Sequence, residues 1–278
     1  MLVNLNEVLK KAQKEKYAVG LFNTTDTDML QAVIEAAEES NSPVILGTAE
    51  VLLPYGELKL IAPSVIAAAK RANVPVVVHY DHGLTFDRCI EALKLGFSSI
   101  MFDGSAKLYE QNIAETREMV KIAHAFGATV EGEIGHVGEA AKEDNLLTDM
   151  YTTPEEAKAY LEATGVDALA VAIGSAHGVY KKKPMLNIER LKEISGAVKV
   201  PLVLHGGSGL SDDDFKNTIR NGIAKVNIFT DLCLAGESAM KDGEEKKLGY
   251  LETRNLKVEY IKEAVKHKMS LFGSVNKV

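Results

Sequence analysis

Eight short apolar runs, each followed by a longer stretch with helical spacing, are the feature that most restricts the fold of this sequence. The runs, taken as candidate strands, are 19–23, 44–47, 76–80, 99–103, 129–133, 168–173, 201–206 and 224–228. Several are apolar almost throughout, which is typical of parallel strands that are buried on both faces. Strands that alternate with helices form parallel sheets. Eight such units in 278 residues favour a closed α/β (β/α)8 TIM barrel over an open sheet.

The segments between these runs are predicted to be helices. Helical spacing is evident at 28–40, 86–96, 154–165 and 214–222, and Gly96, Gly165 and Gly222 stand where helices would end. The region 232–278 also has helical character, with a charged interruption at 241–247. We expect these additional C-terminal helices to cap the barrel or to dock on a neighbour. Because no interdomain linker is evident, we expect one catalytic domain over residues 1–278.

Composition and charge exclude several classes of protein. The net charge of −7 and the pI near 5.6 argue against a nucleic-acid-binding protein, which would show a basic face. Cys89 and Cys233 form no CxxC pair, so a disulfide framework or a cysteine zinc site has no support. The start of the chain lacks the apolar stretch of a signal peptide, and no segment has the length of a membrane helix. We expect a cytoplasmic protein without a membrane partner.

Polar residues with catalytic potential gather where the predicted strands end, which is where barrel enzymes build their active sites. They are His79, Asp81 and His82 after the third strand, Glu131 and Glu133 in the fifth, His177 after the sixth and His205 after the seventh. His82, His177 and His205 would offer three neutral imidazoles to a divalent ion, for which zinc is the best fit and cobalt, iron or manganese are alternatives. Asp81 is either an acid/base beside that ion or a cap or ion-pair partner.

The other histidines receive simpler interpretations. We expect His79 to be a buried residue that supports the site. His124 and His267 are expected at the surface. His136 falls in 135–153, an irregular stretch after the fifth strand whose length is uncommon unless the loop is functional.

A second group of residues follows the seventh and eighth strands. The segment HGGSG at 205–209 and the segment KVNIFTD at 225–231 lie where barrel enzymes often hold a phosphate. Glycines allow backbone N–H groups to converge on an anion, and Ser208, Asn227 and Thr230 can add hydrogen bonds. A plain turn is the alternative for a glycine-rich stretch taken alone.

These motifs resemble those of the class II aldolases, in the branch that contains the fructose-bisphosphate and tagatose-bisphosphate aldolases. The resemblance covers essentially the whole chain and rests on 17–23, 42–47, 78–83, 130–135, 171–180, 201–209, 225–231 and 261–278. It implies a metal-dependent lyase of carbohydrate metabolism that acts on a phosphorylated sugar. Relatives are homodimers or homotetramers, and some bind a monovalent cation, Na⁺ or K⁺, beside the substrate phosphate.

Carried over by position, the resemblance assigns roles to individual residues. His82, His177 and His205 become the ligands of the catalytic Zn²⁺, and Glu133 becomes a further metal-site carboxylate at which a second divalent ion could bind. Glu131 becomes a residue that supports the metal ligands without binding the metal itself. Asp81 becomes the acid/base at the C4 hydroxyl. The site for dihydroxyacetone phosphate comprises Asn23, Gly178, Gly206, Gly207, Ser208, Asn227, Ile228, Phe229 and Thr230.

The implied reaction is the reversible cleavage of a ketose 1,6-bisphosphate of the fructose or tagatose type. Asp81 removes the C4 hydroxyl proton while the C3–C4 bond breaks, and the metal stabilises the negative charge that develops on dihydroxyacetone phosphate. The aldehyde product would be one such as glyceraldehyde 3-phosphate. A second proton is handled by a loop glutamate, for which Glu143 is the first candidate and Glu139 the second.

Three departures from the family pattern concern the substrate. Many relatives have Asp or Ala where this chain has Phe229, and a hydroxyl residue where it has Ala49. Relatives supply an arginine for the distal phosphate; here Arg254 is the nearest candidate, and Lys181, with Lys182 and Lys183, is another. A 6-substituted ketose 1-phosphate that yields a different aldehyde is therefore an alternative substrate.

Two other functions would use parts of the same set of residues. A metal-dependent hydrolase would use the same three histidines to activate water. A sugar-phosphate-binding barrel without turnover would use the phosphate segments alone. The combination of phosphate segments, three histidines and Asp81 favours the aldolase.

Overall fold

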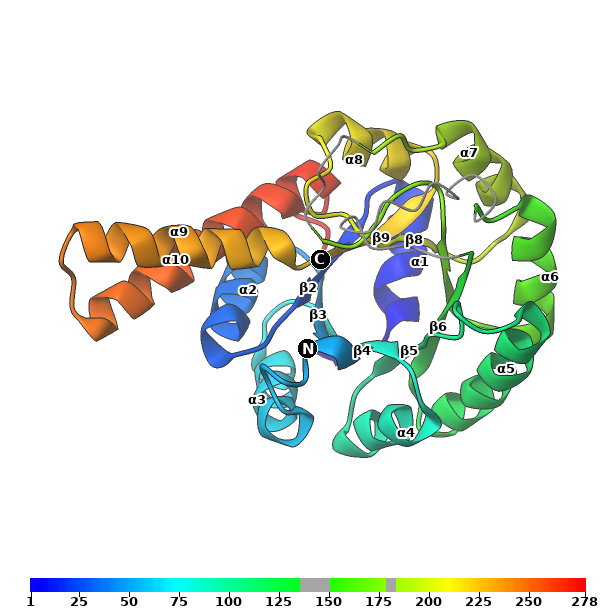
Figure 1. Cartoon of the computed structure of the whole chain (residues 1–278), viewed down its shortest axis with the longest axis horizontal. Helices are drawn as coiled ribbons and strands as arrows, with labels where there is room; N and C mark the ends of the chain where they lie inside the picture. The colour runs from blue at the N-terminus through cyan, green and yellow to red at the C-terminus, as the bar shows by residue number, and fades with distance from the viewer. Residues whose placement is uncertain (136–150, 179–183) are drawn as a thin grey trace.

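The structure is a computed structural model that describes residues 1–135, 151–178 and 184–278 (Figure 1). Its centre is a closed barrel of parallel strands in the order β4-β3-β2-β9-β8-β7-β6-β5, with β5 pairing back onto β4. The strands are β2 Val19–Asn23, β3 Val44–Ala49, β4 Val76–Gly83, β5 Ser99–Phe102, β6 Thr129–Ile134, β7 Ala168–Val171, β8 Leu202–Leu204 and β9 Ile223–Ile228. All eight predicted strands are present, so the predicted TIM barrel is confirmed.

Helices surround the barrel and connect successive strands (Figure 1). They are α2 Thr27–Glu39, α3 Leu58–Arg71, α4 Phe86–Leu95, α5 Tyr109–Ala125, α6 Pro154–Thr164, α7 Ile188–Ala197 and α8 Asp212–Arg220, and a short 3-10 helix, η1 Glu50–Leu52, follows β3. None of the helices in the described part of the chain is long and apolar enough to cross a membrane.

Local sequence explains where these helices start and stop. The Thr153 hydroxyl and the Glu156 carboxylate form a reciprocal capping box at the start of α6. Gly96 and Gly165 take left-handed backbone conformations, with φ of 99° and 73°, directly after α4 and α6. Gly222 also has a positive φ, but α8 ends earlier and Asn221 is its cap. The three predicted stop residues therefore lie at helix ends, Gly222 one residue later than expected.

The N-terminal end of the barrel is closed by the first helix. A two-residue strand, β1 Leu2–Val3, pairs with the start of β4, and α1 Leu5–Glu15 follows it. The apolar face of α1, with Leu5, Val8 and Leu9, is fully or almost fully buried in a core that includes inward-facing strand residues such as Leu21 and Ile45. A larger apolar layer packs the outer helices against the strands. Because one end of the barrel is filled in this way, the C-terminal end carries the cavity.

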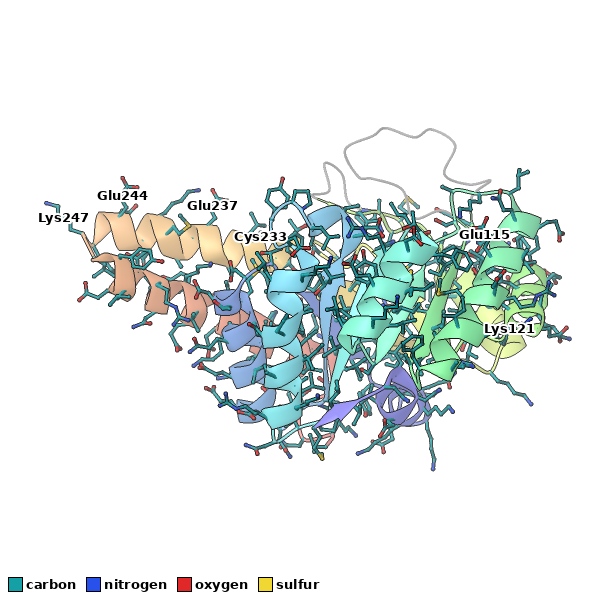
Figure 2. All side chains as sticks on the ribbon, turned by 90° about the horizontal axis from the view of Figure 1, so that it is seen from below. Glu115, Lys121, Cys233, Glu237, Glu244 and Lys247 are labelled. Carbon is teal, nitrogen blue, oxygen red and sulfur yellow. The ribbon has the colours of Figure 1, made fainter. Side chains whose placement is uncertain are left out.

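Two C-terminal helices, α9 Thr230–Glu245 and α10 Tyr250–Phe272, lie side by side and project beyond the barrel (Figure 1). The predicted interruption at 241–247 is present but lies later in the chain, because α9 continues to Glu245 and the break falls at 246–249. Ion pairs spaced four residues apart, such as Lys246 with Asp242 at 2.7 Å, make the charged run compatible with an exposed helix. Figure 2 shows Glu237 and Glu244 pointing outward from this pair of helices. The end of α10 returns to the barrel, where the Phe272 carbonyl accepts a hydrogen bond from the Ala18 amide.

Candidate active site

A cavity of about 550 Å³ opens at the C-terminal ends of the strands. It is lined by all nine residues predicted to bind substrate: Asn23, Gly178, Gly206, Gly207, Ser208, Asn227, Ile228, Phe229 and Thr230. The predicted metal and acid/base residues Asp81, His82, Glu133 and His177 line it too. Among the predicted site residues in the described ranges, His205 does not line the cavity itself but lies against His82 and His177, and Arg254 lies elsewhere.

Three imidazoles meet at the floor of this cavity. The ring centroids of His82 and His205 are 4.6 Å apart, those of His82 and His177 are 5.0 Å apart, and those of His177 and His205 are 5.7 Å apart. One nitrogen from each ring lies within 4.8 Å of the other two. Nε2 of His82 is buried and has no hydrogen-bond partner among the described residues, and Nδ1 of His205 makes no hydrogen bond there, although Oε2 of Glu133 lies 3.2 Å from it. The donor set therefore fits a divalent cation such as Zn²⁺.

The backbone of β4 aims His82 at this point. Its pairing with β5 shifts register between Tyr80 and Gly83, and His82 adopts a left-handed conformation with φ of 49°. Nδ1 lies 2.7 Å from Oδ2 of Asp103. Burial lowers the pKa of His82, but the Asp81 and Asp103 carboxylates outweigh burial and hold that pKa above its ordinary value.

Two glutamates hold His205. Nε2 lies 2.8 Å from Oε1 of Glu131, and Nδ1 lies 3.2 Å from Oε2 of Glu133. Burial lowers the pKa of His205, but these carboxylates outweigh it and raise that pKa to about 10. His177 behaves in the opposite way, because burial and the neighbouring His82 and His205 lower its pKa to about 3. Before a metal binds, the three rings therefore differ in protonation.

A second set of metal-capable donors shares His82. Its members are His82, Asp103 and Glu133, one donor atom from each lying within 4.8 Å of the others. The carboxylates add oxygen ligands to the imidazoles of the first set. Asp103 had not been predicted as a site residue, although it ends the candidate strand 99–103 and so lies where a functional residue is expected.

Asp81 is buried beside the histidines and is held by two amides. Nδ2 of Asn23 donates to its Oδ2 at 2.9 Å, and Nδ2 of Asn227 donates to its Oδ1 at 3.0 Å. Burial raises the pKa of Asp81, but His82 and Lys225 outweigh burial and hold that pKa well below its ordinary value. The side chain is therefore a carboxylate that can accept a proton. His79 lies behind it, fully buried, with Nδ1 2.7 Å from Oγ of Ser99.

Glycine-rich backbone also lines the cavity. Gly206 has a φ of 64°, and a Cβ there would lie 2.3 Å from the carbonyl oxygen of Ala176. A side chain at this position would collide with the segment that carries His177. Oγ of Ser208 accepts a hydrogen bond from the Phe229 amide at 3.2 Å, which ties the β8 loop to the start of α9. A helix N-terminus beside a glycine-rich loop favours binding of an anion.

Several predicted residues are not placed at the cavity. Arg254 on α10 binds α2, with Nε 2.8 Å from Oδ1 of Asp28 and a terminal nitrogen 2.6 Å from Oε1 of Gln31, and it does not line the cavity. The predicted residues that lie outside the described ranges are Glu139, Glu143, His136, Lys181, Lys182 and Lys183.

Other residues at the site had not been predicted. Val51, Leu52, Leu84 and Ser105 line the cavity beside Ala49 and Asp103, and Lys225 lies buried below it. Apolar residues after a strand resemble ordinary loop residues in a sequence. Lysine is rarely buried, so nothing in the sequence signals the position of Lys225.

A barrel that places imidazoles, a carboxylate and a glycine-rich loop at its C-terminal end has the features of a metal-dependent barrel enzyme. Comparison with known proteins specifies the family. Residues 3–277 match the family described as fructose-bisphosphate aldolase class-II. The chain belongs to this family and is a metal-dependent aldolase, a lyase that acts on phosphorylated sugars.

Individual relatives support this membership. The chain is 41% identical to the Escherichia coli K12 protein YdjI, over 100% of this chain and 99% of the relative. It is also 41% identical to the fructose-bisphosphate aldolase of Thermus caldophilus, over 100% of both chains. The crystal structure of the YdjI aldolase matches with a TM-score of 0.91 at 39% identity, over 100% of this chain and 99% of that one. The crystal structure of a putative fructose-1,6-bisphosphate aldolase from Coccidioides immitis matches with a TM-score of 0.89 at 30% identity, over 99% of this chain and 97% of that one.

Proposed function

We propose that the chain is a zinc-dependent aldolase that reversibly cleaves a ketose 1,6-bisphosphate of the fructose or tagatose type. The products are dihydroxyacetone phosphate and an aldehyde such as glyceraldehyde 3-phosphate. The observation that carries the proposal is the juxtaposition of His82, His177 and His205 with the Asp81 carboxylate at a cavity that a glycine-rich loop also lines.

His82, His177 and His205 are the proposed zinc ligands, with Glu133 and Asp103 available to a second divalent ion. A bound divalent ion supplies Lewis-acid chemistry, which polarises the C2 carbonyl and stabilises developing negative charge. The buried nitrogens of His82 and His205 support this assignment, since buried polar atoms normally have partners.

Asp81 is the proposed base in cleavage and the acid in condensation. Its carboxylate takes the proton of the C4 hydroxyl, and the electrons of that O–H bond form the aldehyde carbonyl while the C3–C4 bond breaks. Asn23 and Asn227 hold both carboxylate oxygens, so the base is fixed before substrate arrives. We assign the second proton transfer, at C3 of the triose, to Glu143 or Glu139.

The phosphate of the triose half is proposed to bind at Gly178, at the β8 loop and at the start of α9. Backbone N–H groups of a glycine-rich turn and of a helix N-terminus supply the donors. A monovalent cation, Na⁺ or K⁺, beside this phosphate completes the proposed set of cofactors.

A 6-substituted ketose 1-phosphate is a second candidate substrate, supported by the apolar residues that line the cavity. They include Val51, Leu84 and Phe229. Val51 and Leu84 are 65% and 46% exposed, so apolar surface meets solvent at the rim. Arg254, the candidate for a second phosphate, is occupied by Asp28 and Gln31 within the described chain.

We further propose that residues 1–278 form one catalytic domain of a cytoplasmic homodimer or homotetramer. The α9–α10 pair supports an oligomer, because it projects from the barrel and exposes Tyr250 and Leu251, which are 84% and 69% accessible. Apolar residues at such exposure are common in protein–protein contacts.

The experiment is a comparison of kcat/KM for zinc-loaded protein with fructose and tagatose 1,6-bisphosphates and with ketose 1-phosphates that differ at C6. The proposal predicts that dihydroxyacetone phosphate appears from at least one substrate in a one-to-one ratio with an aldehyde. Hydrolysis of esters or amides without triose phosphate release would point instead to the hydrolase.

A further inference from the structure

The one lysine that the described structure buries completely lies directly beneath the cavity and has no role in the proposed reaction. Lys225, in β9, is 0% exposed. Two residues along the same strand, Asn227 lines the cavity, and residues spaced by two face the same side of a strand. Lys225 therefore lies one layer below the substrate. A buried ammonium group is costly unless it is paired, so the identity of its partners is informative.

Its two partners, Glu131 and Asn227, contact a proposed metal ligand and the proposed acid/base, respectively. Nζ of Lys225 lies 2.7 Å from Oε2 of Glu131, whose other oxygen lies 2.8 Å from Nε2 of His205. Nζ also donates to Oδ1 of Asn227 at 2.8 Å, and Nδ2 of Asn227 donates to Asp81 at 3.0 Å. A single ammonium group thus joins a proposed metal ligand to the proposed acid/base through one intermediate residue on each side.

The chemistry of these groups fixes their orientation. An ammonium group only donates hydrogen bonds, so Asn227 must present its amide oxygen to Lys225. The amide nitrogen of Asn227 is then directed toward the acceptor-only carboxylate of Asp81. Without Lys225, the amide could rotate and place its oxygen against Asp81, with loss of that hydrogen bond.

The same ammonium group holds Glu131 in place. Nζ of Lys225 contacts one carboxylate oxygen of Glu131, and the other oxygen contacts Nε2 of His205. This contact leaves Nδ1 of His205 directed at His82 and Glu133. Orientation of a ligand histidine by a carboxylate contributes to metal affinity.

We propose that Lys225 is a positioning residue that sets the orientation of His205 through Glu131 and the orientation of Asp81 through Asn227. The inference rests on the proposed roles of His205 and Asp81. It differs from a purely structural role, in which Lys225 only neutralises the buried charge of Glu131.

Two variants separate these roles. Lys225→Met removes the charge and the donors but nearly preserves the volume, and it leaves Glu131 uncompensated. Lys225→Met with Glu131→Gln removes both charges, and the glutamine oxygen can still accept from His205. Should the single variant fail to fold, the double variant alone carries the test. Folding is checked by thermal melting, and the metal site by the visible absorption spectrum of the Co²⁺-substituted protein.

If Lys225 positions Asn227, the double variant folds and binds Co²⁺, but its kcat for cleavage is lower by about tenfold or more. Exchange of the C3 proton of dihydroxyacetone phosphate, which does not need Asp81, falls less than cleavage does. Introducing Asn227→Ala into the double variant then lowers kcat for cleavage by a smaller factor than the same substitution does in the parent protein. Cleavage by the double variant at the parental kcat and KM would overturn the proposal, as would fully additive effects with Asn227→Ala.

Discussion

Nδ1 of His82 lies 2.7 Å from Oδ2 of Asp103, so the other ring nitrogen is the one that faces His177 and His205. This pairing determines which atom of His82 a metal ion meets. A carboxylate behind a ligand histidine fixes the ring and makes it more basic. The geometry of the proposed zinc site therefore depends on a residue that need not bind the zinc itself.

Replacement of Asp103 should weaken metal binding. Asp103→Asn removes the charge behind His82, and we expect zinc affinity to fall by about 10- to 100-fold, as measured by competition with a chromogenic chelator. His124 and Asp167 provide a matched control, because they form a second histidine–carboxylate pair at 2.9 Å that lies outside the cavity. His124→Asn should leave zinc affinity unchanged. Equal effects of both substitutions would contradict the proposed support of His82.

Removal of Asp81 should affect cleavage without emptying the metal site. We expect Asp81→Ala to reduce kcat by about 10²- to 10⁴-fold, because general acid–base catalysis at C4 is lost. Zinc content and exchange of the C3 proton of dihydroxyacetone phosphate should remain, since neither requires a base at C4. Cleavage as fast as in the parent protein would show that Asp81 is not the acid/base.

Zinc binding should release protons. The pKa of His205 is raised to about 10, so this ring is protonated at pH 8, and the pKa of His82 is raised as well. A metal ion must displace the proton of His205, so affinity should fall as pH falls. Calorimetric titration at pH 8 in buffers of different ionisation enthalpy should show release of about one proton or more per zinc. A binding enthalpy that is the same in every buffer would contradict the raised pKa values.

The packing of α1 against the N-terminal end of the barrel should contribute strongly to stability. Leu9 of α1 is fully buried there, and we expect Leu9→Ala to lower the free energy of unfolding by about 2–5 kcal/mol. Leu60 on α3 is 79% exposed, so Leu60→Ala should change the free energy of unfolding by at most about 0.5 kcal/mol. Urea denaturation measures both. Similar losses in the two variants would mean that α1 does not close the barrel as described.

The apolar rim should influence the choice of substrate. Placing a cation there with Leu84→Lys should raise kcat/KM for ketose bisphosphates relative to ketose 1-phosphates by about five- to tenfold, since a charge-assisted contact favours the second phosphate. Leu60→Lys controls for added positive charge away from the cavity. An unchanged ratio in the Leu84 variant would show that the distal group does not lie along this wall.

The barrel was predictable because its information is local. Runs such as 76–80 and 168–173 are apolar enough to specify buried strands, and Gly96 and Gly165 mark helix ends. The break between the last two helices was placed too early, at 241–247, because charge on an exposed helix resembles charge in a loop. The strand β1 was missed because two residues carry no periodicity.

Site residues that lie at the ends of strands, such as His82 and Asp81, were predictable from the sequence. The site was not predictable where a contact joins distant segments. The pairing of Arg254 with Asp28 links residues 226 positions apart, and the burial of Lys225 depends on closure of the barrel. Such contacts follow from the packing of whole elements, which periodicity alone does not give.

Zinc titration of the metal-free protein, with release of dihydroxyacetone phosphate as the signal, is the most direct test of zinc-dependent cleavage at the three histidines. We expect that the metal-free protein does not cleave a ketose 1,6-bisphosphate. The rate should then rise with added zinc up to one equivalent per chain, and His205→Ala should abolish the rise. Cleavage at the full rate without metal would contradict a zinc-dependent reaction, as would a zinc response that survives the loss of His205.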